Sequence, residues 1–314
     1  ASAALTKYAE YLQAPVITTS EGKGVITDKH YLSLGVPRVQ DAPMRRVIED
    51  RPVVLAVGTR MATANLPEGH QVIQIDVDAE EIGRNHPNTL GILGDAAQSL
   101  EELYKATVEH VGPQASHEIE FEEFRNNRYD PEKLQQPQGS YTAAIRAAIP
   151  EDGILVSGMT QIGYFSRAYY PVYQPRTYIT SSYSGNLGFA YPTALGAKVA
   201  QPNKAVVCIS GDGGFMYNSQ ELATAAQYGI NVVVVVFNDN AFGNVLRDQT
   251  VRLKGRLIGT ELHNPDFVKL AEAHGVYGVR VNGPEALEAA IKQTLEANAP
   301  ALIEVPVEMM ESSF

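Results

Sequence analysis

The chain has 314 residues and a formal net charge of −11, with 44% hydrophobic and 19% charged residues. This length and composition predict a globular protein of two domains with a sizeable core. The acidic balance argues against a nucleic-acid partner, because no basic stripe is available to neutralise phosphates. No run approaches the length of a membrane span, and the lone Cys208 fits a reducing cytoplasm, where we expect the protein.

The first residues predict an amphipathic helix, because Leu5, Tyr8, Ala9 and Leu12 share one helical face. The chain has no initiator methionine and no strand before this helix. We therefore expect a fragment or a processed product of a longer protein.

Residues 1–110 alternate predicted strands with predicted helices. We expect strands at 14–20, 52–58 and 71–77, and helices at 80–84 and 95–105. Apolar β-branched runs such as 52–58 are typical of strands buried on both faces. Such alternation predicts a parallel sheet with helices packed on it.

Residues 111–139 are polar, contain three prolines and predict a linker with one short helix around 121–126. The strand and helix pattern then restarts over 140–314. Strands are expected at 153–157, 177–180, 205–210, 231–237 and 301–305, and helices at 192–200, 219–228, 264–274 and 284–297. The sequence thus predicts an α/β protein of two Rossmann-like units with mostly parallel sheets flanked by helices.

A glycine-rich motif with one aspartate, SGDGGF at 210–215, directly follows a predicted strand. Asp212 therefore lies at the carboxyl end of a parallel strand, where open α/β sheets bind their ligands. Gly213 and Gly214 leave backbone amides bare for an anion, and a following helix N-terminus favours phosphate. The Asp212 carboxylate is a hard oxygen ligand of the kind that Mg²⁺ takes together with phosphate oxygens. An ordinary glycine turn with a solvated aspartate is the alternative.

A second polar segment, NDN at 238–240, ends the apolar run 232–237. Asp239 lies 27 positions after Asp212, which accommodates one helix and one strand. A right-handed crossover would place the two strand ends side by side. Two carboxylates, a nearby backbone carbonyl and two phosphate oxygens would satisfy an octahedral Mg²⁺. A β-turn without a metal is the alternative.

Together these segments resemble the signature of thiamine-diphosphate-dependent enzymes, Gly-Asp-Gly followed further along the chain by Asn-Asn. The resemblance implies metal ligation by the side chains of Asp212 and Asp239 and by the main-chain oxygen of Ala241. Asp239 departs from the family pattern, because it adds a negative charge where the family has asparagine; this would tighten the metal or weaken the cofactor. The neighbouring residues implied as cofactor contacts are Gly211, Gly213, Gly214, Asn238, Phe242 and Gly243.

Two upstream segments extend the resemblance. Residues 184–198 resemble the stretch in which a bulky side chain supports the bent cofactor, and Leu187 occupies that position. An ordinary helix entry with a proline in its first turn is the alternative. Residues 156–161 resemble a loop whose main chain contacts the diphosphate, which implies Met159 and Thr160 as further cofactor contacts.

The first hundred residues resemble the central domain of acetolactate-synthase-type and related 2-oxo acid enzymes, on segments 14–24, 55–60, 75–78 and 94–95. The resemblance implies a central domain over 1–110 that is truncated at its N-terminus. It also implies a domain over 140–314 that binds thiamine diphosphate through Mg²⁺, beyond the linker at 111–139. Arg60 stands where flavin-binding relatives contact flavin; no other residue supports FAD, and a structural ion pair is the alternative.

The resemblance implies a lyase or transferase that decarboxylates a 2-oxo acid, joins the acyl unit to a second carbonyl compound, or does both. In the family, a glutamate on a pyrimidine-binding domain activates the cofactor, and no glutamate of this chain lies in a matching segment. We therefore expect that domain to come from the rest of the protein or from another chain, in a homodimer or homotetramer. This chain alone is expected to bind the cofactor weakly.

Other functions stay open at this point. They are a thiamine-dependent lyase acting on an acyl-CoA or other ketone donor, and a truncated or non-catalytic cofactor-binding subunit. A nicotinamide dehydrogenase would need Gly-x-Gly-x-x-Gly after a strand, and the strand at 53–58 is followed by Thr-Arg-Met-Ala instead. Asn240, Phe242 and Asn244 are candidates for substrate contact by resemblance, and Arg247 would either hold a carboxylate or be an ordinary helix residue.

Overall fold

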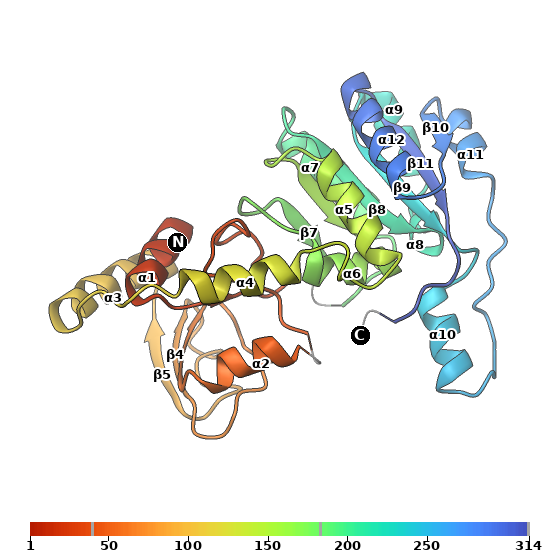
Figure 1. The fold of residues 1–314 in the computed structure, drawn as a ribbon. Coiled ribbons are helices and arrows are strands. Elements are labelled where there is room, and N and C mark those ends of the chain that lie inside the picture. The colour runs from red at the N-terminus through yellow and green to blue at the C-terminus, as the bar shows by residue number, and fades with distance from the viewer. Residues whose placement is uncertain (39–40, 182–183, 313–314) are drawn as a thin grey trace. The chain divides into compact units, whose positions relative to one another are not determined.

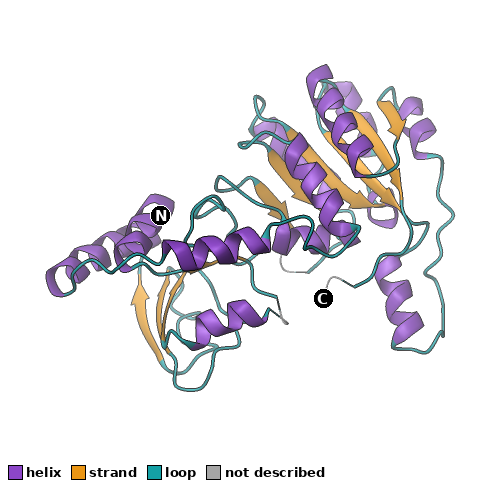
Figure 2. Cartoon of the chain, viewed as in Figure 1, coloured by secondary structure: helices purple, strands orange, loops and turns teal. Residues whose placement is uncertain are grey.

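The computed structural model describes residues 1–38, 41–181 and 184–312. The chain divides into two compact units, coloured along the sequence in Figure 1; unit 1 is Ala1–Ile17 with Lys29–Arg125, and unit 2 is Thr18–Asp28 with Asn126–Phe314. Every ladder described between named strands is parallel, and helices flank the sheets (Figure 2), which confirms the predicted α/β class. Within the described ranges, no helix combines the length and apolar character that a membrane span requires.

Unit 1 holds a three-stranded sheet in the order β3-β4-β5 with two helices packed against its core. Its elements are α1 (Ser2–Leu12), β1 (Val16–Ile17), β2 (Ser33–Gly35), α2 (Ala42–Glu49), β3 (Val53–Val57), β4 (Gln71–Asp76), β5 (Thr89–Leu93) and α3 (Ala96–His110). Tyr8 of α1, Ile75 of β4 and Leu100 of α3 form the centre of this core. Asp95 caps α3, because its carboxylate accepts hydrogen bonds from the amides of Ala97 and Gln98.

One sequence prediction for unit 1 is wrong, and three of its elements, β2, α2 and β5, were not predicted. The segment 80–84 forms turns and no helix. The buried side chain of Gln74 holds it in that form, by donating to the Glu81 carbonyl at 3.1 Å and accepting from the Gly83 amide at 2.9 Å. Strand β5 was not predicted, because its side chains are mostly exposed and lack a clear apolar pattern.

Unit 2 holds a six-stranded parallel sheet in the order β10-β11-β9-β8-β6-β7. Its strands are β6 (Ile154–Ser157), β7 (Tyr178–Thr180), β8 (Val206–Gly211), β9 (Val233–Asn238), β10 (Tyr277–Arg280) and β11 (Ala301–Pro306). Its helices are α5 (Gln138–Ala148), α6 (Gln161–Tyr169), α7 (Ala190–Ala200), α8 (Asp212–Met216), α9 (Glu221–Tyr228), α10 (Gly243–Val251), α11 (Phe267–Ala273) and α12 (Pro284–Ala297). Helix α4 (Glu118–Arg128) crosses the boundary between the units and is longer than the short helix expected around 121–126.

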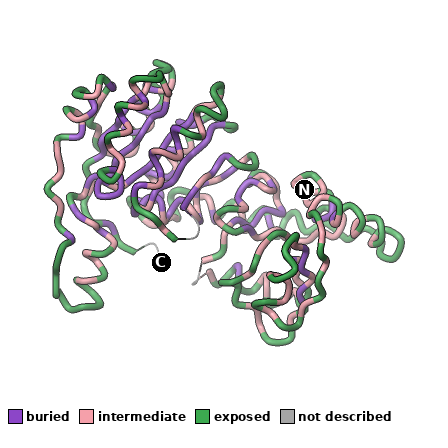
Figure 3. The backbone as a smooth tube through the Cα atoms, turned by 180° about the vertical axis from the view of Figure 1, so that it is seen from behind, coloured by how far each residue is buried: buried purple, intermediate pink, exposed green. Residues whose placement is uncertain are grey.

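The sheet of unit 2 is buried on both faces (Figure 3). Alternate residues of β8 and β9 belong to two different core clusters: Val207 and Val235 pack with α5, α6 and α12, whereas Cys208 and Val234 pack with α7, α8, α9 and α11. Such two-sided burial is why these strands read as continuous apolar runs. The polar residues that follow each run are therefore confined to the strand ends.

The order of the strands creates a natural ligand site at the carboxyl edge of this sheet. After β6 the chain enters α6 on one face and leads outward to β7; after β8 it enters α8 and α9 on the opposite face and leads to β9. The loops after the adjacent strands β6 and β8 thus diverge. In open α/β sheets, such a point of divergence leaves a crevice in which ligands bind.

The start of α6 depends on close approach to the loop after β6. A methyl group at Gly163 would overlap the carbonyl oxygen of Gly158. We predict that Gly163→Ala lowers the free energy of unfolding by about 1–3 kcal/mol, as overpacking commonly does. In the matched control Gly196→Ala, within α7, the new methyl group meets nothing within 4 Å, so a gain of about 1 kcal/mol is expected. Urea unfolding of both variants measures the difference, and equal gains would contradict the argument.

Candidate functional site

The loop after β8 begins a short helix directly at its aspartate. Asp212 is 2% exposed, and its Oδ1 accepts a hydrogen bond from the Gly213 amide at 2.8 Å. A side chain at Gly213 would come within 2.5 Å of the Phe242 ring, so glycine is required there by the close approach. The sequence predicts a helix from 219, whereas α8 already starts at 212. The amides of this first turn therefore lie beside the aspartate, and the Gly213 amide donates to it.

The loop after β9 lies next to the first loop. Strand β9 runs parallel to β8 with Gly211 opposite Phe237, so the following residues sit at neighbouring strand ends, as the crossover argument predicts. Asn240 adopts a left-handed backbone conformation with φ 54°, which asparagine tolerates well. A methyl group at Gly243 would overlap the Asp239 carboxylate, so this glycine gives the carboxylate its place over the start of α10.

The two carboxylates share an electrostatic environment that disfavours their charges. Burial raises the pKa of Asp212 above its ordinary value, although the amides of Gly213, Asn240 and Ala241 and the Asn264 side chain oppose the shift. Burial also raises the pKa of Asp239 to about 6, and the negative charge of Asp212 adds to that shift. Two ionised carboxylates at this point repel each other, and a bound cation would relieve the repulsion.

A cavity of about 240 Å³ joins these loops to the loop after β6. Twelve of the residues singled out from the sequence line it, and they are Met159, Thr160, Leu187, Gly211, Asp212, Gly213, Gly214, Asp239, Ala241, Phe242, Gly243 and Asn244. Asn238 does not line the cavity. Its Nδ2 donates to Glu304 Oε1 at 2.8 Å and its Oδ1 accepts from the Asn240 amide at 3.1 Å, so it lies behind the loops.

Asn264 is part of this arrangement, although the sequence did not single it out. Its Nδ2 lies 2.6 Å from Asp212 Oδ2, 3.0 Å from Asn238 Oδ1 and 3.3 Å from Asn240 Oδ1. The signal in the sequence is weak, because an asparagine before a proline and a helix is also an ordinary turn residue. Asn264 and Asp212 are 52 positions apart in the sequence, so only the folded chain brings them into contact.

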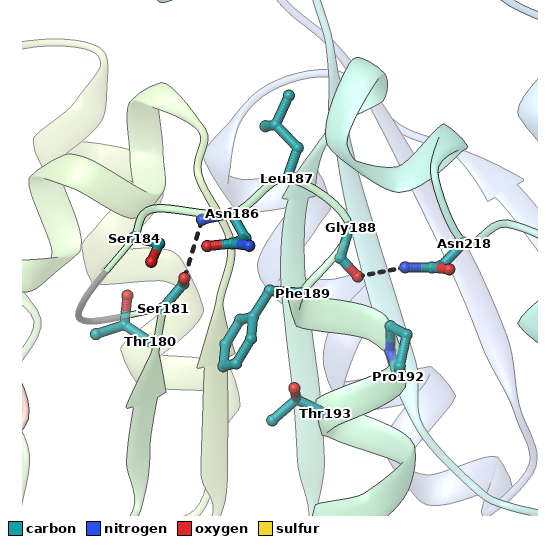
Figure 4. A pocket seen from close by; sticks show the side chains of 10 residues that line it. All are labelled: Thr180, Ser181, Ser184, Asn186, Leu187, Gly188, Phe189, Pro192, Thr193 and Asn218. Atoms are coloured by element: carbon teal, nitrogen blue, oxygen red, sulfur yellow. Dashed lines mark hydrogen bonds between the residues drawn. The ribbon is translucent and has the colours of Figure 1, made fainter.

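Leu187 lines this cavity and also a second hollow of about 560 Å³, whose residues Figure 4 shows. Its side chain points away from the polar groups around it and is 37% exposed. Hydrogen bonds hold the backbone on both sides: the Asn186 amide donates to Ser181 Oγ at 3.0 Å, and Asn218 Nδ2 donates to the Gly188 carbonyl at 2.8 Å. The loop thus presents a large apolar side chain on a fixed backbone.

Arg247 of α10, a candidate for holding a carboxylate, is engaged within the protein. Its Nη1 donates to Gln161 Oε1 at 3.0 Å and to the Met310 carbonyl at 3.2 Å, and its Nη2 donates to Asn244 Oδ1. All three partners line the cavity. The guanidinium therefore supports the wall of the cavity in this structure.

The chemistry of these groups fits Mg²⁺ held together with a diphosphate. In the described part of the chain, no cluster of three or more His, Cys, Asp or Glu side chains offers a closed metal cage. Mg²⁺ needs no such cage, because it commonly takes one or two carboxylates and completes its shell with phosphate and carbonyl oxygens. The Ala241 carbonyl takes no part in the two hydrogen bonds beside it. These run from Phe242 N to Thr260 O and from Leu262 N to Asn240 O, both 2.8 Å, so they do not compete with a metal for that oxygen.

The charge of Asp239 should lower the free energy of unfolding of the metal-free chain at neutral pH. Because its pKa is raised from 3.8 to about 6, the folded chain holds this proton more tightly than the unfolded chain. The resulting loss of stability is complete at pH 7 and vanishes below about pH 4. We predict that Asp239→Asn raises the free energy of unfolding at pH 7.5 by about 1 kcal/mol, after allowance for solvent screening.

Urea unfolding in the presence of a chelator at pH 7.5 and 4.5 measures this effect. Asp248→Asn, which changes an exposed carboxylate of α10, is the matched control and should show no comparable gain. A gain from Asp239→Asn that is equal at both pH values would contradict the electrostatic argument.

Comparison with known proteins agrees with this geometry. Residues 158–305 match the family model of the thiamine pyrophosphate enzyme C-terminal TPP binding domain, and residues 1–103 match the central domain of the same enzymes. The chain is 31% identical to the acetolactate synthase large subunit of Haemophilus influenzae, over 98% of this chain and 56% of the relative. It is also 31% identical to the acetolactate synthase isozyme 3 large subunit of Escherichia coli, over 93% and 54% of the two chains.

A protein named probable 2-ketoarginine decarboxylase AruI, from Pseudomonas aeruginosa, is 32% identical over 92% of this chain and 52% of its own length. The chain spans about half the length of the curated relatives it matches. The two family models together cover most of the chain, and the acetolactate synthase relatives match almost all of it. The chain belongs to the thiamine pyrophosphate enzyme family.

Proposed function

We propose that this chain is the part of a thiamine-diphosphate-dependent enzyme that holds the cofactor's diphosphate, and that the whole enzyme acts on a 2-oxo acid. The reaction is decarboxylation, carboligation of the resulting acyl unit, or both, as in a lyase or transferase. The observation that carries the proposal is the single cavity that gathers the loops after β6, β8 and β9 around Asp212 and Asp239. Relatives named acetolactate synthase and 2-ketoarginine decarboxylase support the class of substrate.

The proposed metal ligands are the side chains of Asp212 and Asp239 and the main-chain oxygen of Ala241. Both carboxylates lie at neighbouring strand ends, and Ala241 is 7% exposed beside them. The amide of Gly214, in the buried first turn of α8, would donate to a phosphate oxygen, and Gly213, whose amide donates to Asp212 Oδ1, would keep the backbone open beside it. Gly211, Phe242 and Gly243 complete the walls of the cavity. Asn238 would support the loops from behind, through its hydrogen bonds to Glu304 and to the Asn240 amide.

Bound thiamine diphosphate would supply the nucleophilic carbon and the electron sink that a 2-oxo acid needs in order to lose CO₂. The chain's own residues would orient it. Leu187 would support the cofactor between its rings, because a fixed backbone presents this apolar side chain at the cavity. The main chain of Met159 and Thr160 would contact the diphosphate from the loop after β6, with Thr160 buried in the cavity wall.

The proposal assigns residues 1–110 to a central domain, 111–139 to a linker and 140–314 to the diphosphate domain. The family models at 1–103 and 158–305 support this division. The proposed partner is a pyrimidine-binding domain that supplies the activating glutamate, from the rest of the protein or from another copy in a homodimer or homotetramer. The match to about half of each relative's length supports a contribution from residues outside this chain.

Calorimetric titration with thiamine diphosphate tests the proposal. Binding is expected with Mg²⁺ present and is expected to weaken at least tenfold, or about 1.4 kcal/mol, without the metal or in Asp212→Ala. The exposed Asp248→Ala variant is the control and should bind as the unchanged chain does. Absence of binding by the unchanged chain, or binding indifferent to both metal and Asp212, would contradict the proposed site.

A further inference from the structure

A short segment before α11 runs along the loop after β9. Ala241 and Glu261 form an antiparallel bridge, flanked by the hydrogen bonds that join Phe242 to Thr260 and Leu262 to Asn240. Thr260 is 2% exposed, so the segment is anchored in the protein. We call residues 260–264 the strap. Asn264, at its end, is thereby delivered to the point where the two loops meet.

The side chain of Asn264 contacts both loops at once. Its Nδ2 lies 2.6 Å from Asp212 Oδ2 in the loop after β8, and 3.0 Å from Asn238 Oδ1 in the loop after β9. An amide nitrogen has two hydrogens, so it can serve both acceptors in full. The bond to Asp212 is charge-assisted and therefore the stronger of the two.

A buried glutamate and the Asn240 amide together determine which way this chain of amides points, because the Asn240 amide donates to Asn238 Oδ1 at 3.1 Å. Glu304 of β11 is 3% exposed, and its Oε2 accepts from Arg280 Nε at 2.8 Å. Because a carboxylate only accepts, the Asn238 group 2.8 Å from Glu304 Oε1 must be its NH₂. The Asn238 oxygen then faces Asn264, which must turn its own NH₂ towards Asn238 and Asp212.

We propose that Asn264 is a positioning residue of the metal site: it fixes the Asp212 carboxylate and couples the two ligand loops, in an orientation that Glu304 and the Asn240 amide set through Asn238. This inference rests on the proposed function, because it presupposes a divalent cation at Asp212 and Asp239. With Gly213 N on Oδ1 and Asn264 on Oδ2, the carboxylate is held from two sides and presents its remaining lone pairs in a fixed direction. A ligand fixed in advance loses less conformational entropy when the metal binds.

The affinity for Mn²⁺ in the presence of thiamine diphosphate tests the inference. It is measured through the electron paramagnetic resonance signal of the unbound ion. Asn264→Ala and the similarly sized Asn264→Leu both remove the donor and are expected to weaken Mn²⁺ at least tenfold. Asn231→Ala is the matched control, because it removes an asparagine–asparagine bond of 2.9 Å, to Asn298, that does not involve the metal loops. Urea unfolding of the metal-free chains reports separately on the fold.

The relay from Glu304 gives an independent readout. Glu304→Gln removes one of the two groups that orient Asn238 and leaves only the Asn240 amide, so it should weaken Mn²⁺ in the chain that retains Asn264. In the Asn264→Ala background, the same change should have no further effect on Mn²⁺ affinity. A purely structural role would instead give additive losses that follow the loss of folding stability.

The outcomes separate the two claims. If the unchanged chain binds no Mn²⁺ with thiamine diphosphate, the proposed function fails. If it binds, and Asn264→Leu binds equally well, the positioning role is overturned while the proposed function stands. Additive effects of Glu304→Gln and Asn264→Ala would likewise overturn the coupling through Asn238.

Discussion

The site depends on one electrostatic constraint: two carboxylates are held at the adjacent ends of buried parallel strands. The register of β8 and β9 places Asp212 and Asp239 just beyond neighbouring strand ends, and both strands are packed on both faces. Burial raises the pKa of both carboxylates, and the charge of Asp212 raises the pKa of Asp239 further. The fold therefore maintains an arrangement that is unfavourable by itself, which is typical of a binding site and not of a structural ion pair.

The glycines around the carboxylates follow from the same crowding. Gly213 gives room to the Phe242 ring, and Gly243 gives room to the Asp239 carboxylate. Each removes a side chain where backbone and ligand groups must approach closely. The strap then contacts both loops through Asn264, which bonds the Asp212 carboxylate in one loop and Asn238 in the other.

The sequence predicts those parts of the molecule that depend on local patterns. Strands β6, β8, β9 and β11 come from apolar runs ended by polar residues, and they locate Asp212 and Asp239 correctly at one sheet edge. Local sequence patterns do not predict the structure where a side chain distant in the sequence determines the conformation of a segment. Gln74 holds 80–84 as turns, and the role of Asn264 depends on a strap that pairs with the loop after β9. The resemblance to a family supplied Leu187, Met159 and Thr160, which no periodicity singles out.

Asp239 remains the departure with the greatest chemical consequence. A pair of ionised aspartates would neutralise a divalent cation completely, whereas one aspartate with an asparagine would leave a positive charge for the diphosphate. The glycine loop at 213–214 and the start of α8 must then supply more of the electrostatic attraction for the diphosphate. A chain built in this way would gain metal affinity in the absence of cofactor and would rely on an accurate fit of the glycine loop to hold the phosphates. The close packing of Gly213 against Phe242 is consistent with that reliance.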